Sequence, residues 1–165
     1  MHLLCQMLCQ TDVTDADLLL KYQCLVDCLL YLTIMTQPDI SYHVMWLGQF
    51  NACPRHLYFH AAKHVLCYLA GMQTLALCLG ALSSFVLTSL KAFMQIVGCS
   101  DADCASDSSD QRSISGYCFC FEGSLVSWSA VKQRSITLSS TEAKYYTMTH
   151  AFKEALWIWV FLGLL

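Results

Sequence analysis

The sequence has little charge of either sign. Only 13% of its 165 residues are charged and 56% are hydrophobic, whereas about 25% of residues are charged in typical soluble domains. The net charge of −3 excludes a broad basic surface of the kind that binds nucleic acid. Any contact with nucleic acid would therefore have to be local, or be made by other parts of a larger protein.

Zinc-type spacing is absent, although cysteine is plentiful. The eleven cysteines include no C-x-x-C pair, and the shortest spacing is that of Cys118 and Cys120. The N-terminus lacks the basic region of a signal peptide and soon reaches Asp12. We therefore expect a cytoplasmic protein that is not secreted, in a reducing compartment where most thiols behave as inert core residues.

Acidic and basic residues are also missing from His64 to Leu90. About 20 apolar residues can span a bilayer, so this 64–90 segment supports an alternative function as a small membrane-associated protein. Its first part, however, belongs to a predicted helix that ends at Gly71, and the remainder contains Gly, Ser, Thr and Gln. We therefore favour a strand and a loop here over a membrane span.

Apolar residues at helical spacing predict three helices between about Asp17 and Ala70. The second helix should begin near Gln37-Pro38-Asp39 and the third at Cys53-Pro54, because proline is tolerated in a first turn. The stripe of the first helix consists of Leu18, Tyr22, Leu25, Leu29 and Leu32. Residues 1–72 are therefore expected to form a helical domain, followed by a linker or strand over 73–92.

The pattern changes in the last part of the chain. Strand-like runs cover Met94 to Ser100, Ile114 to Phe121 and Ser124 to Ser129, and Glu122-Gly123 forms a hairpin turn. Ser139 to Glu142 is a capping box that opens a C-terminal helix. The predicted fold class is α+β, in which residues 93–165 form a partial domain of three antiparallel strands and a helix.

Several local strings occur in a specific order and spacing. They are Cys24–Thr33, Gln37–Tyr42, Ala61–Leu69, Ser100–Asp103, Ser113–Tyr117, Ser127–Ser129, Lys132-Gln133 and Leu138–Tyr145. By these strings the chain resembles the C-terminal part of the Pol polyprotein of copia-type retrotransposons. The resemblance implies the end of a reverse transcriptase, or a connection region, followed by the start of a ribonuclease H domain.

The resemblance also implies a chemistry. Ribonuclease H cuts the RNA strand of an RNA–DNA hybrid, and four carboxylates hold two magnesium ions that activate water and stabilise the leaving oxygen. Asp101 matches the first aspartate of this family, which acts as a metal ligand. Asp103 follows two residues later, so it would share a strand face with Asp101 and is a weaker candidate ligand.

The second carboxylate of the family falls on a lysine here. The family string reads Thr-Glu-Ala-Glu-Tyr, and we align its ligand with the second glutamate, where this chain has Lys144. Lysine carries only donors and cannot bind magnesium. Glu142 is the alternative catalytic residue, but it lies about 200° from Lys144 around a helix and can serve the capping box instead.

Other departures from the family pattern indicate an inactive copy. The third and fourth family aspartates lie beyond the helix, and the sequence ends at Leu165. Family arginines are replaced by Gln37, His64 and Cys67, as in a truncated and decayed element. We expect no productive magnesium or RNA–DNA partner, and we expect self-association or aggregation. His60 and His64 are four residues apart but lack the accompanying glutamate of a zinc motif.

Overall fold

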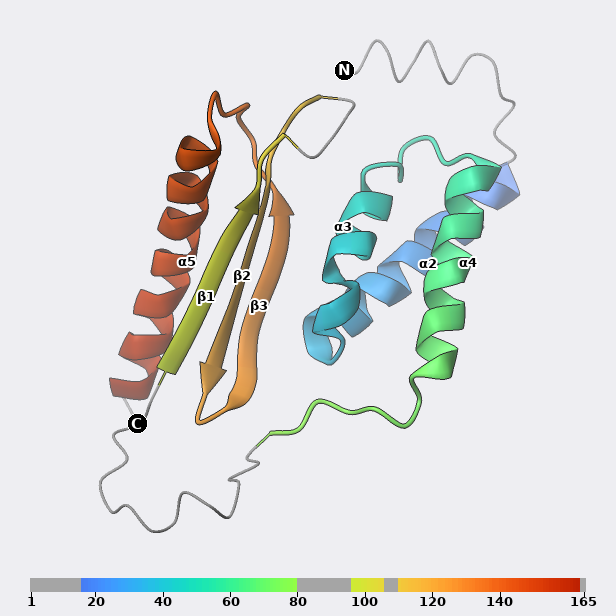
Figure 1. The fold of residues 1–165 in the computed structure, drawn as a ribbon. Coiled ribbons are helices and arrows are strands. Elements are labelled where there is room, and N and C mark those ends of the chain that lie inside the picture. The colour runs from blue at the N-terminus through green and yellow to red at the C-terminus, as the bar shows by residue number, and fades with distance from the viewer. Residues whose placement is uncertain (1–15, 80–95, 106–109, 164–165) are drawn as a thin grey trace. The chain divides into compact units, whose positions relative to one another are not determined.

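A computed structural model describes residues 16–79, 96–105 and 110–163 of the chain (Figure 1). The chain forms two compact units, Met1–Ala76 and Leu77–Leu165. The first contains helices and the second contains a sheet with one helix. This α+β class, with the helices first, is the one that the sequence predicts. Each unit is described by itself below.

Over its described residues, the helical unit contains four elements. They are α2 (Ala16–Met35), the short 3-10 helix η1 (Pro38–Ile40), α3 (Ser41–Gly48) and α4 (His56–Gly71). Pro38 opens η1 and Pro54 lies just before α4, where a missing backbone N–H costs nothing. The three predicted helices are confirmed, except that η1 forms the start of the second one.

The core of this unit includes Tyr22 and Leu29 of the predicted stripe, together with Val26, which was not predicted. Tyr22, Val26 and Leu29 of α2 pack against Ile40, Val44, Leu47 and Ala62. Tyr22 is fully buried, and its hydroxyl donates a hydrogen bond to the carbonyl oxygen of Leu47 over 2.8 Å. This bond satisfies a polar group that would otherwise be costly to bury, and it joins α2 to the end of α3.

One described helix is long and apolar enough to cross a membrane by length and composition, the part of α2 from Asp17 to Met35. Tyr22, Val26 and Leu29 of this helix lie in the core of the helical unit. The uncharged 64–90 segment is not one continuous helix, because α4 ends at Gly71 and residues 72–79 are turn and irregular structure. Residues 80–90 lie outside the described part of the chain.

The second unit contains a three-stranded antiparallel sheet with the order β1-β2-β3. Its strands are β1 (Ile96–Asp103), β2 (Ile114–Phe121) and β3 (Ser124–Lys132). Glu122 and Gly123 both have positive φ, 51° and 77°, as a two-residue hairpin of the primed type requires. The start of the first predicted strand, Met94, lies outside the described residues.

Two predicted strand ends were wrong. β1 continues beyond Ser100 to Asp103, because Asp101 and Asp103 pair with Gly116 and Ile114 of β2. β3 likewise continues beyond Ser129 to Lys132, which pairs with Ile114. Backbone pairing with a neighbouring strand therefore overrides the low strand preference of aspartate and lysine.

Helix α5 (Ser140–Gly163) lies along one face of this sheet (Figure 1). Phe119 of β2 packs against Ala151 and Ile158 of α5. Gly98 of β1 is directly opposite Phe119, and a Cβ atom at Gly98 would collide with the phenyl ring. Opposite residues share a face and successive residues alternate, so Gly98 and Ala102 face α5, whereas Asp101 and Asp103 lie on the other face.

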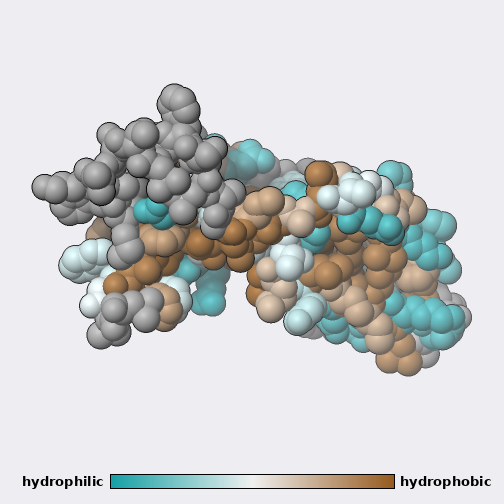
Figure 2. Space-filling model, turned by 90° about the horizontal axis from the view of Figure 1, so that it is seen from below, coloured by the Kyte–Doolittle hydropathy of each residue, from teal (hydrophilic) through white to brown (hydrophobic). Residues whose placement is uncertain are grey.

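Large apolar side chains remain exposed on α5. Phe152, Trp157, Trp159 and Phe161 are each at least half exposed. Hydrophobic residues also occupy much of the face that Figure 2 presents. Exposed apolar surface of this extent favours contacts with other molecules, and the expected self-association stays a prediction that rests on it.

Candidate functional site

The candidate site is centred on Asp101 in β1. Its side chain is 81% exposed, and one carboxylate oxygen, Oδ1, lies 3.6 Å from the Nζ atom of Lys144, which is 62% exposed. The same oxygen accepts a hydrogen bond from the backbone N–H of Ala102 over 2.9 Å. An ion pair this exposed contributes about 0–1 kcal/mol to stability. The pair therefore matters less for stability than for the positive charge that it places beside Asp101.

Lys144 reaches Asp101 because the first turns of α5 are held on the sheet. Ala143 and Thr147 are both fully buried against it. The Thr147 and Ser115 hydroxyls form a hydrogen bond of 2.7 Å between α5 and β2. The long Lys144 side chain extends from this anchored turn to β1, so the ammonium group occupies space next to the aspartate.

Glu142 has a different role, at the start of α5. Its backbone N–H donates to the Ser139 hydroxyl over 3.1 Å, and its carboxylate accepts a hydrogen bond from the backbone N–H of Leu138 over 2.7 Å. The predicted cap is confirmed, although Leu138 rather than Ser139 supplies the second donor. The Glu142 carboxylate is thus directed towards the residues before the helix.

Asp103 is exposed at the end of β1, two residues beyond Asp101. Residues spaced by two on a strand share a face, so the two carboxylates lie on the same side of the sheet. Over the described residues, no group of three or more His, Cys, Asp or Glu side chains is placed to hold a metal ion. The assignment of Asp101, Asp103 and Glu142 to catalysis or metal binding stays a prediction.

A buried polar cluster next to the site was not predicted. Gln133 is 2% exposed, and its side-chain amide donates to the Ser115 hydroxyl at 2.9 Å, the Ala143 carbonyl at 3.1 Å and the Thr147 hydroxyl at 3.3 Å. These contacts join the end of β3 to β2 and α5. Gln133 therefore helps to position the turn that carries Lys144. The only signal in the sequence was the Lys132-Gln133 string.

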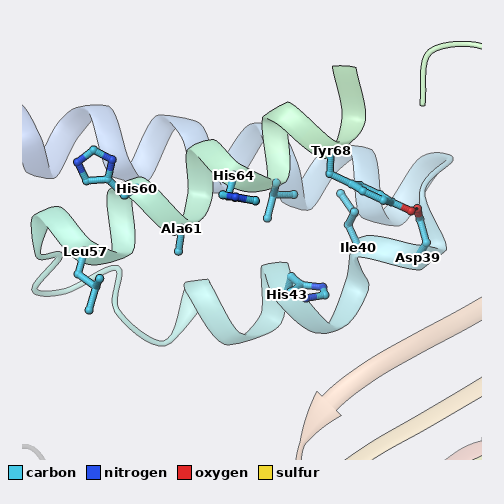
Figure 3. Close-up of a pocket in the computed structure, with 9 residues that line it drawn as sticks. Asp39, Ile40, His43, Leu57, His60, Ala61, His64 and Tyr68 are labelled. Atoms are coloured by element: carbon cyan, nitrogen blue, oxygen red, sulfur yellow. Dashed lines mark hydrogen bonds between the residues drawn. The ribbon is translucent and has the colours of Figure 1, made fainter. Parts of the chain in front are cut away.

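The helical unit has a groove of about 660 Å³ between α3 and α4 (Figure 3). Its walls are largely apolar. His43 projects from α3, His60 and His64 come from α4, and the three rings do not converge on one point (Figure 3). At one end the Tyr68 hydroxyl donates to the Asp39 carboxylate over 2.7 Å, which raises the pKa of Tyr68. The groove therefore lacks the convergent polar groups of a catalytic site.

Comparison with known proteins links at least nine-tenths of the chain to one group of relatives. The chain is 32% identical over 157 residues to the retrovirus-related Pol polyprotein from transposon TNT 1-94 of Nicotiana tabacum, and 37% identical over 148 residues to that from transposon RE1 of Arabidopsis thaliana. These matches cover 94% and 90% of this chain, but only 11% and 9% of the relatives.

A shorter relative matches over most of its own length. The chain is 39% identical over 139 residues to the secreted RxLR effector protein 161 of Plasmopara viticola, which covers 84% of this chain and 92% of that protein. No family model and no solved structure matches the chain. The comparisons therefore rest on sequence relatives, most of which are far longer than this chain.

Proposed function

We propose that this chain, which belongs to the retrotransposon Pol polyprotein family, is a copia-type segment whose ribonuclease H-like unit does not perform two-metal hydrolysis. The family membership confirms the resemblance seen in the sequence. The observation that carries the proposal is the Lys144 ammonium group 3.6 Å from Asp101. The alignment of Lys144 with the second family carboxylate is supported by this proximity.

Charge balance argues against a pair of magnesium ions at this site. Two such ions bring four positive charges and need several oxygen ligands. Asp101 and Asp103 supply one negative charge each, and Lys144 adds a positive one beside Asp101. Glu142 does not compensate, because its carboxylate caps α5 by accepting a hydrogen bond from Leu138. A dication at Asp101 would therefore meet both too few ligands and a fixed cation.

The first test is hydrolysis by the full chain. Purified protein is mixed with a labelled RNA–DNA hybrid and Mg²⁺, with Asp101→Asn as the control. We expect no cleavage above that of the Asp101→Asn variant. Cleavage by the natural sequence that disappears in Asp101→Asn would overturn the proposal, because it would require a working metal site despite Lys144.

The second test changes the sign of the charge beside Asp101. Lys144→Glu replaces the cation with a ligand, and Lys153→Glu makes the same substitution about 180° away on α5. Lys144→Glu changes the charge at this position by two units. At 4 Å from a dication in water, this changes the electrostatic interaction energy by about 4 kcal/mol before salt screening. We therefore expect Lys144→Glu to bind Mg²⁺ or Mn²⁺ at least about tenfold more tightly than Lys153→Glu in calorimetric titrations. Equal binding by the two variants would place the metal site elsewhere.

We do not propose a secreted effector role for this chain. The name of the Plasmopara viticola relative includes the pattern RxLR. Arg55, Arg112 and Arg134 are the arginines of this sequence, and none begins an Arg-x-Leu-Arg string. The pattern in that name therefore has no counterpart here.

A further inference from the structure

Two thiols face each other across the first strand pair of the sheet. Cys99 of β1 is directly opposite Cys118 of β2. Cys99 is exposed, Cys118 is half-buried, and neither is in a disulfide. Both lie on the face of the sheet away from α5, because each adjoins the Gly98–Phe119 pair that faces the helix. The pair is therefore accessible to small solutes.

The strand register places the Cα atoms of Cys99 and Cys118 at a separation that a disulfide can span. Opposite residues in antiparallel strands have Cα atoms about 4.5 or 5.5 Å apart, and disulfides span about 4.4–6.8 Å between Cα atoms. Burial raises the pKa of the Cys118 thiol, and the Cys99 side chain is close enough to Cys118 to contribute to this increase. Only a small adjustment of the side chains would thus be needed to join the two sulfur atoms.

The neighbouring thiol at Cys120 lacks this arrangement. Cys120 is opposite Val97 of β1 on one side and Leu125 of β3 on the other. It is two residues from Cys118, a separation of about 6.7 Å along a strand, with side chains that stand parallel to each other. Cys120 therefore provides a matched control on the same face of the same strand.

We propose that Cys99 and Cys118 are a redox couple that a hydroperoxide such as hydrogen peroxide converts into a cross-strand disulfide. The Cys99 thiol loses its proton, its sulfur attacks one oxygen of hydrogen peroxide, and the O–O bond breaks. A sulfenic acid remains on Cys99, and the hydroxide that leaves takes up the thiol proton and becomes water. The Cys118 thiol then loses its proton, its sulfur attacks the Cys99 sulfur, and the S–S bond forms as the S–O bond breaks. The second hydroxide takes up the Cys118 proton and becomes a second water. Two thiols lose two electrons in all, and the peroxide gains them.

The environments of the two sulfur atoms set this order. The thiolate is the reactive species, and exposure favours oxidation by a solute. Cys99 is the more exposed of the two. Burial, together with the neighbouring Cys99 and Cys120, raises the pKa of Cys118, so Cys118 stays protonated longer and acts as the resolving thiol.

The bond would fix the strand that carries the candidate site. Among the described strands β1 lies at the end of the order and pairs with β2, and Asp101 is two residues beyond Cys99. A disulfide would prevent β1 from separating from β2 without reduction. In a reducing compartment such a bond forms transiently and reports oxidation, which is consistent with the location expected from the sequence.

The test maps disulfides in the full chain. Reduced protein is treated with hydrogen peroxide in native buffer or in denaturing urea, free thiols are alkylated, and linked peptides are identified by mass spectrometry. Cys53 is disulfide-bonded in the structure, and the mapping distinguishes the Cys99–Cys118 link from a disulfide of Cys53 that re-forms after reduction. We expect the Cys99–Cys118 link to be the dominant new product in native buffer, several-fold above its yield in urea.

Three variants sharpen the result. Cys120→Ser should leave the link unchanged, whereas Cys118→Ser should abolish it without transferring it to Cys120. In Val97→Cys combined with Cys118→Ser, the thiol introduced at position 97 should instead link to Cys120, because these positions are opposite in the register. Equal yields in native buffer and urea, or equal linking of Cys99 to Cys118 and Cys120, would overturn the proposal.

Discussion

Replacing Gln133 by alanine should destabilise the sheet unit by about 2–3 kcal/mol. The amide group of Gln133 has two hydrogens that are shared among Ser115, Ala143 and Thr147, and each hydrogen bond contributes about 1 kcal/mol. The cavity left by the side chain adds about 1–2 kcal/mol. The Oε1 atom of Gln133 has no hydrogen-bond partner among the described residues. Removing this unsatisfied buried atom therefore reduces the expected loss of stability by about 1 kcal/mol.

The assay is urea unfolding followed by hydrogen exchange at the β2 amides, which report the sheet unit alone. Lys153→Ala, a truncation at an exposed position of α5 in the same unit, should shift stability by less than about 0.5 kcal/mol. Gln133→Met fills most of the volume without hydrogen bonds, so it should retain the part of the stability that comes from packing. If Gln133→Ala were as mild as Lys153→Ala, the amide cluster would not hold α5 on the sheet.

Three further changes test other parts of the fold. Gly98→Ala should cost about 1–3 kcal/mol in urea unfolding, since its methyl group collides with Phe119, and an unchanged midpoint would contradict the packing of the ring over Gly98. Burial, then the nearby Tyr58, raises the pKa of Tyr22 to about 12. The pKa of tyrosine in an unfolded chain is about 10. The contribution of neutral Tyr22 to the free energy of unfolding is therefore complete below about pH 10 and is lost as the pH rises through about 12. Thermal unfolding of the Tyr22→Phe variant should not show this loss of stability over the same pH range. Oxidation of Cys99 closes a loop of about 20 residues and should raise unfolding stability by about 3 kcal/mol, a gain that a reductant reverses.

The elements of the fold were predictable from local patterns. The stripe through Tyr22 and Leu29 identifies the buried side of α2, and the Ser139–Glu142 string identifies the start of α5. Glu122-Gly123 identifies the hairpin because glycine readily adopts a positive φ, whereas Glu122 adopts one that glutamate rarely shows. Each of these features depends on residues close together in the sequence, which is why sequence alone reveals them.

The features that define the site depend on contacts between distant residues. Gln133 is buried because β2 and α5 enclose it, and glutamine carries no signal that distinguishes this from an exposed position. The opposition of Cys99 and Cys118 follows from the register, which the spacing of cysteines does not encode. The family resemblance pointed to Lys144 and Asp101, but only the packing of α5 brings their side chains to 3.6 Å.

The ammonium group beside Asp101 differs from a metal ion in being covalently attached to the chain. An ion bound from solution exchanges with the medium, whereas the concentration of a tethered counterion never changes. Chelating agents should therefore leave the sheet unit unaffected, and added monovalent salt should merely screen the pair. Under the proposed function, the sheet unit should therefore fold equally well whether or not divalent ions are supplied.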